Sequence, residues 1–152
     1  MALNLIINPN EDTTFYDSVR RILGGIDEET LPNDVIVDPA IFDLAEMEIL
    51  SLVPCIETGE LPPADLQKAR LAMIYLIASK LCQTAKGLVE YEVKTIDVSW
   101  KKKPIDYDVL EDDLIATADS ILSTISCYDS VDRVLLKLAP SRRTVEEENA
   151  GL

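Results

Sequence analysis

The first apolar pattern along the chain predicts a short amphipathic helix. Four apolar residues recur at helical spacing on one face: Phe15, Val19, Ile22 and Leu23. Asp12 or Thr13 can cap its start, and Gly24 and Gly25 can supply the left-handed backbone that ends a helix. Because a helix of about three turns is marginal in water without packing, its apolar face must be buried against the rest of the chain or against a neighbouring subunit.

A second helix is predicted after a turn. Residues 31–37 indicate a turn with a short extended piece, and Asp38 then caps a helix that ends at Pro54. Glu46 and Glu48 are expected to face water.

The strongest helical pattern runs from Leu66 to about Lys86 and is closed by Gly87. Between residues 71 and 81 it is apolar nearly all round. Such a helix lies in the middle of a bundle or in a subunit interface, where more than one side is covered.

The period then changes to the alternation of a strand. Val89, Tyr91 and Val93 share one side, and the next apolar residues occupy a side shifted by one position. This register change predicts a β-like arm or hairpin over residues 88–104. The alternative is a local hairpin packed on its own core.

A last long helix is predicted from Ile105 or Asp106 to about Ser126. Its inner positions recur at helical spacing: Tyr107, Leu110, Leu114, Ala118, Ile121 and Ile125. The fold class is therefore mainly α, a small helical bundle of about four to five helices with a β-like arm between the two long helices and an extended C-terminal tail. The expected organisation is an N-terminal extension (1–13), a helical domain (14–138) and a tail (139–152).

Charge narrows the classes of function. The chain of 152 residues has a net charge of −14, and its eight central Lys and Arg residues between 67 and 103 form a basic island in an acidic chain. A protein that binds nucleic acid in a groove needs basic groups to neutralise phosphates, so this net charge argues against a nucleic-acid-binding groove as the main role of the chain. Such asymmetry suits contacts between complementary faces of subunits, although a solvated charged surface is the commoner explanation.

The cysteines and the apolar runs indicate the cellular compartment in which we expect the protein. Cys55, Cys82 and Cys127 are odd in number and lack CxxC spacing, so they are interpreted as small buried residues in a reducing compartment. The longest apolar run, residues 71–78, is far shorter than the roughly 20 residues that span a bilayer. We expect a soluble intracellular protein without membrane contact.

Enzyme chemistry has no support in the sequence. Histidine is absent, which removes Ser-His-Asp, Cys-His and most catalytic zinc arrangements. No GxxxxGK[ST] or GxGxxG motif occurs. We therefore expect no catalytic residues, no metal and no cofactor.

Two charged clusters remain as candidate sites. Glu111, Asp112 and Asp113 are successive helix residues that point in different directions, so they cannot converge on one metal ion, and a solvated face explains them better. Lys101, Lys102 and Lys103 can contact DNA phosphates with Trp100 stacking beside them, but in so acidic a chain they more readily bind an acidic face of a neighbouring subunit.

The order of these patterns resembles the head-to-tail connector (adaptor) proteins of tailed bacteriophages. The similarity covers roughly residues 14–127. Its loose motifs are Tyr16-Asp-Ser-Val-Arg-Arg-Ile-Leu-Gly, Leu31-Pro-Asn-Asp-Val-Ile, Ala45-Glu-Met-Glu-Ile-Leu, the Ala-rich third helix, the arm and the late helix from Tyr107 to Ile125. The bulky arm end, Trp100-Lys-Lys-Lys-Pro, departs from the expected pattern.

The resemblance implies a structural virion protein of the phage neck, assembled in the host cytoplasm. Family members are helical bundles that form a homo-oligomeric, dodecameric ring under the portal protein, extend the DNA channel used in packaging and genome ejection, and dock the next neck or tail-completion protein. DNA then passes without specific binding, and Glu111, Asp112 and Asp113 are candidate carboxylates of the lumen.

The resemblance also implies contact residues. The tail is the expected portal anchor, with Leu138, Ser141, Arg142 and Arg143 as candidates, although a solvated tail is the plain alternative. The arm is the expected inter-subunit element, with these candidates: Tyr91, Val93, Trp100, Lys101, Lys102 and Lys103. The competing hypothesis is a small acidic binding or regulatory protein, a DNA-mimic-like inhibitor whose carboxylates bind a basic partner.

Overall fold

The computed structural model describes residues 4–95 and 105–128, with side chains described for 4–88 and 105–128. Helices make up its regular structure, and no strand occurs in these ranges. The elements are α1 (Thr14–Ile22), α2 (Asn33–Ile36), α3 (Phe42–Leu52), the 3-10 turn η1 (Pro54–Ile56), α4 (Pro63–Thr95) and α5 (Tyr107–Leu122). The expected mainly α, small helical bundle is confirmed.

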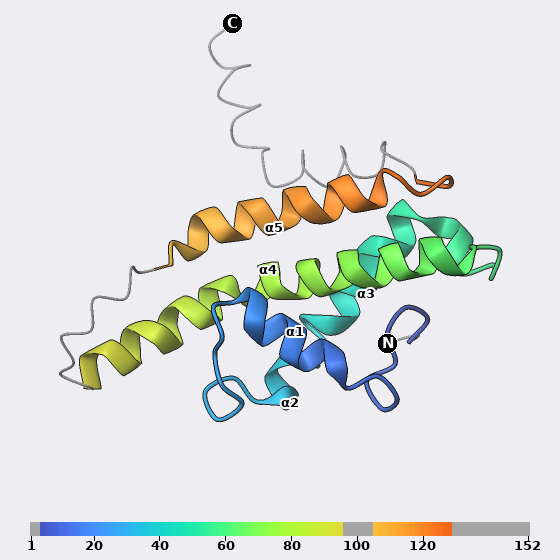
Figure 1. The fold of residues 1–152 in the computed structure, drawn as a ribbon. Helices are drawn as coiled ribbons and strands as arrows, with labels where there is room; N and C mark the ends of the chain where they lie inside the picture. Colours follow the sequence, from blue (N-terminus) through green and yellow to red (C-terminus); the bar gives the residue numbers. More distant parts are fainter. Residues whose placement is uncertain (1–3, 96–104, 129–152) are drawn as a thin grey trace, which may run out of the picture.

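Helix α4 is the centre of the bundle. It contacts α1, α3 and α5, and α5 runs antiparallel along it on the side away from α1 and α2 (Figure 1). Its buried side chains occupy several faces of the helix, among them Ala69, Met73, Leu76, Ile77 and Leu81. The pattern that is apolar all round therefore belongs to a helix covered on more than one side, as the sequence predicts.

Helix α1 ends as its sequence predicts, and the ending places the start of α5. Gly24 and Gly25 both have positive φ (102° and 78°). The Gly25 N–H donates to the carbonyl of Arg20 (2.9 Å) and the Gly24 N–H to that of Arg21 (3.1 Å), which is the Schellman arrangement. A Cβ on Gly24 would clash with Cδ1 of Ile105. This position thus needs glycine for its backbone angle and for the close approach of a side chain beside α5.

A buried tyrosine joins the same two ends. Tyr107, in the first turn of α5, is 5% exposed, and its hydroxyl donates to the carbonyl of Leu23 (3.0 Å). Burial raises the pKa of this phenol. The hydroxyl stays protonated and satisfies a carbonyl at the end of α1 that the helix itself leaves unpaired.

The expectation that Glu46 and Glu48 face water is wrong for Glu46. Glu46 is 1% exposed, and its carboxylate accepts the backbone N–H groups of Asn4 (3.1 Å) and Leu5 (3.2 Å). Glu48 is partly exposed and pairs with Lys80 on α4 (3.0 Å). A buried carboxylate is tolerated here because backbone donors of the N-terminal segment replace water.

The predicted closure at Gly87 is wrong. Helix α4 continues through Gly87 to Thr95, and Gly87 has none of the positive φ found at Gly24. A glycine inside a helix costs only about 1 kcal/mol relative to alanine. The packing of α4 against α1, α3 and α5 offsets this cost. The β-like arm is therefore not supported over residues 88–95, and its remainder, 96–104, lies outside the described residues.

The turn with an extended piece over residues 31–37 is also corrected, because residues 33–36 form the short helix α2. Pro32 precedes its first residue in extended conformation (ψ 157°), and Ile36 is fully buried. Proline suits this place because its fixed φ favours the start of a helix and its missing N–H would be unpaired there.

The interpretation of all three cysteines as free buried residues is wrong for two of them. Cys55 in η1 and Cys127 after α5 form a disulfide, with their Cα atoms 6.2 Å apart. Cys82 on α4 is free and fully buried. The pair joins positions 72 residues apart, a distance at which no local spacing signals a pairing.

Candidate functional site

Helix α5 carries the described candidate residues, and its own first turn fixes its direction. Asp106 is the N-cap: its side chain accepts the backbone N–H groups of Asp108 (3.1 Å) and Val109 (3.3 Å). One face of the helix is buried against the bundle through Tyr107, Leu114, Ala118 and Leu122. The opposite face is therefore held towards the outside of the bundle.

The three candidate lumen carboxylates do not form one cluster. Glu111 is partly buried, and its Oε2 accepts a hydrogen bond from Nε2 of Gln83 on α4 (3.3 Å). Asp112 and Asp113 are exposed. Successive helix residues point about 100° apart, so Glu111 borders α4 while its two neighbours face outward.

Beyond its first turn, where Val109 is exposed, the exposed side of α5 is acidic and otherwise made of small residues. We call it the outer face of α5, and it consists of Asp112, Asp113, Ala116, Thr117 and Ser120. Helix α5 contains no Lys or Arg. The hydroxyl of Thr117 turns back to donate to the carbonyl of Asp113 (2.8 Å). The outer face thus presents negative charge on a smooth surface with short side chains.

Among the described residues, one base, Lys86, pairs with α5, and it does so at the edge beside α4. Asp108 accepts a hydrogen bond from Gln83 (2.7 Å) and pairs with Lys86 (3.3 Å). These partners, Gln83 foremost, hold the pKa of the Asp108 carboxyl below its usual value. Lys86 is therefore paired with Asp108 at the edge beside α4 and does not neutralise the charge of the outer face.

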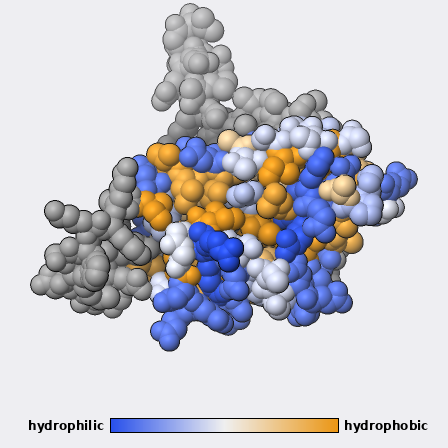
Figure 2. Space-filling model, viewed as in Figure 1, coloured by the Kyte–Doolittle hydropathy of each residue, from blue (hydrophilic) through white to orange (hydrophobic). Residues whose placement is uncertain are grey.

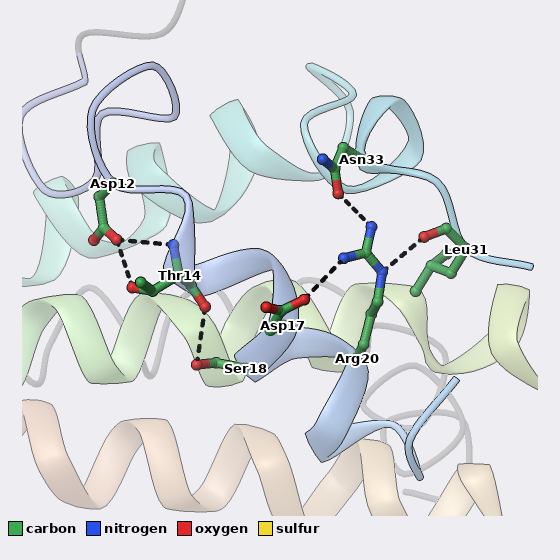
Figure 3. Close-up of polar contacts among 7 residues, drawn as sticks. All are labelled: Asp12, Thr14, Asp17, Ser18, Arg20, Leu31 and Asn33. Atoms are coloured by element: carbon green, nitrogen blue, oxygen red, sulfur yellow. Dashed lines mark hydrogen bonds and ion pairs between the residues drawn. The ribbon is translucent and has the colours of Figure 1, made fainter. Parts of the chain in front are cut away.

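A second polar arrangement, around α1, acts as scaffold. Arg20 is 6% exposed; its Nε donates to the carbonyl of Leu31 (3.0 Å), and its terminal nitrogens donate to Asp17 (3.4 Å) and Asn33 (Figure 3). These contacts hold together α1, the loop after it and α2. A buried guanidinium whose donors are satisfied in this way fixes structure.

The start of α1 is tied to α4 by another arginine. Asp12 accepts the N–H and the hydroxyl of Thr14 (3.2 and 2.7 Å; Figure 3) and binds Nε of Arg70 at 2.7 Å. Arg70 holds the pKa of Asp12 below its usual value, with Thr14 adding to the effect against the raising effect of burial. Of the two predicted caps, Asp12 makes the side-chain contact and Thr13 makes none.

Apolar side chains are also exposed. Figure 2 shows hydrophobic side chains gathered over the middle of the viewed face, along α4 and α5, with hydrophilic ones below them. Leu44 and Met47, three residues apart on α3, are 45% and 57% exposed, and Val109 on α5 is 54% exposed. Leu44 and Val109 belong to the apolar stripes that the sequence predicts for their helices, but such a stripe does not tell which of its members another element will cover.

The other candidate residues lie where the structure gives no side chain. Tyr91 and Val93 are in the last turns of the extended α4, and their side chains are not described. Trp100, Lys101, Lys102 and Lys103 lie outside the described residues, as do the predicted portal contacts Leu138, Ser141, Arg142 and Arg143. The inter-subunit and portal contacts stay predictions.

Chemical sites are sparse in the described part of the chain. No group of three or more Cys, Asp or Glu residues within it is placed to hold a metal ion. Within the same residues, no helix has both the length and the apolar content to cross a membrane. No protein-family model, no curated protein and no solved structure matches the chain.

Proposed function

We propose that the chain is a structural subunit of a tailed-phage neck, a head-to-tail connector that forms a homo-oligomeric ring beneath the portal protein. The observation that carries the proposal is the outer face of α5, which is acidic, built of short side chains and without a base on its helix. With α5 turned inward in each subunit, this face lines a channel for the genome.

Such a lining suits DNA that must move. Duplex DNA carries one phosphate charge per about 1.7 Å of axis, and basic side chains bind it by releasing its counterions. Carboxylates at Asp112 and Asp113 release none and repel the phosphates. Ala116, Thr117 and Ser120 add no long side chain that could lodge in a groove. The genome can pass in both directions without being held.

The exposed apolar residues support assembly into a ring. Leu44 and Met47 lie on one face of α3, whereas Val109 lies at the start of α5. Exposed apolar patches on a protein surface mark contact sites. The exposed apolar pair on α3 suits a head-to-tail contact, in which this surface of one subunit meets a different surface of the next copy, and such contacts close into rings.

The direct experiment is electron microscopy of the chain reconstituted with the portal protein. The expected result is a closed ring at the portal, with α5 facing the channel. Portal particles without this chain, or a ring with α5 on its outside, would contradict the proposal.

Charge reversal tests the role of the outer face. Asp112→Lys/Asp113→Lys should leave the ring intact but make it bind duplex DNA, with an affinity that falls steeply as salt rises. The matched control is Glu28→Lys/Glu29→Lys, which reverses two adjacent exposed acids of the α1–α2 loop and should leave DNA binding weak. Equal DNA binding by both variants would remove the lumen assignment.

The same variants test the competing function. A small acidic regulator would be absent from portal rings, would bind a basic protein through its carboxylates, and would lose that binding in the α5 variant. That combination of results would replace the connector proposal.

A further inference from the structure

The Cys55–Cys127 disulfide joins two parts of the chain that are 72 residues apart in sequence. Cys55 belongs to η1, directly after α3, and Cys127 lies five residues beyond the end of α5. Both residues are partly exposed. Small thiols and disulfides in solution can therefore reach the pair.

The third cysteine cannot compete for either partner. Cys82 is fully buried in α4, and its thiol donates to the carbonyl of Ala78 (3.4 Å). Burial, with smaller contributions from Glu111 and Asp108, raises the pKa of this thiol to about 11. Since the thiolate is the attacking species in disulfide exchange, oxidation of the folded chain has one product.

The bond lies just beyond the last regular turn of α5. After Leu122 the chain is held by single-turn hydrogen bonds: Thr124 to Ile121 (3.2 Å), Ile125 to Leu122 (3.0 Å) and Tyr128 to Ile125 (3.1 Å). Ile125 is buried, but Ser123, Thr124 and Ser126 are exposed. The covalent link therefore adds a fixed connection to η1 in a segment that Ile125 alone among residues 123–126 anchors in the core.

We propose that Cys55 and Cys127 form a reversible redox staple, which fixes residues 123–128 to η1 when oxidised and releases them when reduced. Oxidised glutathione, or another low-molecular-weight disulfide, is the oxidant. One cysteine thiolate attacks it and expels one glutathione thiolate; the second cysteine thiolate then attacks the mixed disulfide and expels the other. The two cysteines lose two electrons and two protons, and two molecules of reduced glutathione form.

The staple makes the end of α5 responsive to the redox state of its surroundings and is independent of ring assembly. Residues 123–128 precede the C-terminal part of the chain, so the bond sets whether that part starts from a fixed point. The bundle itself is held by α4 and its apolar contacts and is expected to remain folded in the reduced state.

The first test equilibrates the full chain in buffers of varied reduced-to-oxidised glutathione ratio, followed by alkylation and mass spectrometry. A single transition should protect Cys55 and Cys127 together, while Cys82 stays in thiol form throughout. Cys82→Ala should show the same transition. Alkylation of Cys55 and Cys127 at every ratio, or protection of Cys82 with one of them, would overturn the staple.

The second test compares oxidised and reduced chains by circular dichroism and by amide hydrogen exchange at short labelling times. The helical signal should persist, and the amides of Thr124, Ile125 and Tyr128 should exchange about ten-fold faster on reduction, with those of α1 and α3 unchanged. Cys55→Ser/Cys127→Ser should match the reduced chain. Loss of the helical signal on reduction, or identical exchange in both states, would overturn the proposal.

Discussion

The N-terminal half of the bundle and helix α5 are both packed on α4, but they use polar side chains in opposite ways. Around α1 and α3 the polar contacts are buried: Arg20 is 6% exposed and Glu46 is 1% exposed. Along α5 the contacts of charged side chains lie at the exposed edge, where the side chain of Asp108 is 62% exposed, and the buried hydroxyl of Tyr107 belongs to the junction with α1. The side chains of the outer face of α5 are exposed.

This difference indicates that the N-terminal half stabilises the fold, whereas the outer face of α5 is available for contacts with other molecules. Losing one partner of a buried polar contact leaves the other without water and costs more than the contact itself contributes. Exposed polar contacts contribute little because water replaces them. Substitutions in the N-terminal half should therefore change stability, whereas those on the outer face of α5 should change what the molecule repels or binds.

The largest effect should come from Arg20→Ala. The change leaves the Leu31 carbonyl and the Asn33 side chain without their donor in a buried place, and it should lower the free energy of unfolding by about 3 kcal/mol. Urea denaturation measures this loss. The matched control is Arg21→Ala at the exposed neighbouring position, expected within about 0.5 kcal/mol of the unchanged chain. Equal losses for both variants would contradict the scaffold role.

Gly24→Ala should rank next. Alanine is strained at positive φ by roughly 1–2 kcal/mol, and its Cβ also meets the end of the exposed Ile105 side chain, which must shift, so a total loss of about 2 kcal/mol is expected. Gly25→Ala is the control, because Gly25 also has positive φ but nothing lies within 4 Å of an added Cβ. Thermal unfolding should place the Gly25 variant between the Gly24 variant and the unchanged chain. The reverse order of stability would show that the side chain of Ile105 does not lie against Gly24.

The smallest effect concerns the pair of Asp12 and Arg70, and it depends on pH. The folded-state pKa of Asp12 is lowered, so its stabilisation is fully present above the unfolded pKa and disappears as pH falls through the folded one. Arg70→Gln should lower the free energy of unfolding by up to about 1 kcal/mol at pH 7, with the difference fading as the pH falls through the lowered pKa of Asp12.

Lys68→Gln serves as its control. Lys68 pairs with Asp65 within α4 at 3.5 Å, and its side chain is 44% exposed. Its removal should matter less at every pH than the loss of Arg70, which connects different elements. Urea titrations at several pH values compare the two variants, and a pH-independent effect of Arg70→Gln would contradict the role of its charge.

The local features of the fold could be predicted from the sequence. The stripe of α1, its glycine stop, the central place of α4 and the start of the last helix near Asp106 each depend on residues within a few turns of one another. The helix end predicted at Gly87 is wrong because a glycine ends a helix only where the backbone has positive φ. The local sequence does not show where packing lets a helix continue through a glycine.

The remaining features depend on residues far apart in the chain. Glu46 is buried because the backbone of Asn4 and Leu5, some forty residues earlier, offers it two donors. Cys55 finds its partner across 72 residues. For the candidate site, the sequence supplied the three carboxylates of α5, but only the packing of Leu114 and Ala118 against the bundle separates Glu111, at the α4 edge, from the outward-facing pair.

The contact between the end of α1 and the start of α5 also sets an order of events during synthesis. The Leu23 carbonyl can accept its hydrogen bond only after Tyr107, 84 residues later, has been synthesised. The contact between Gly24 and Ile105 likewise needs the later residue. A ribosome that has translated α1 to α4 has therefore produced a chain whose first helix still lacks its last neighbour. Nascent copies should remain open along α4 until α5 emerges, so completion of the bundle is a late step that a chain truncated before residue 105 can never reach.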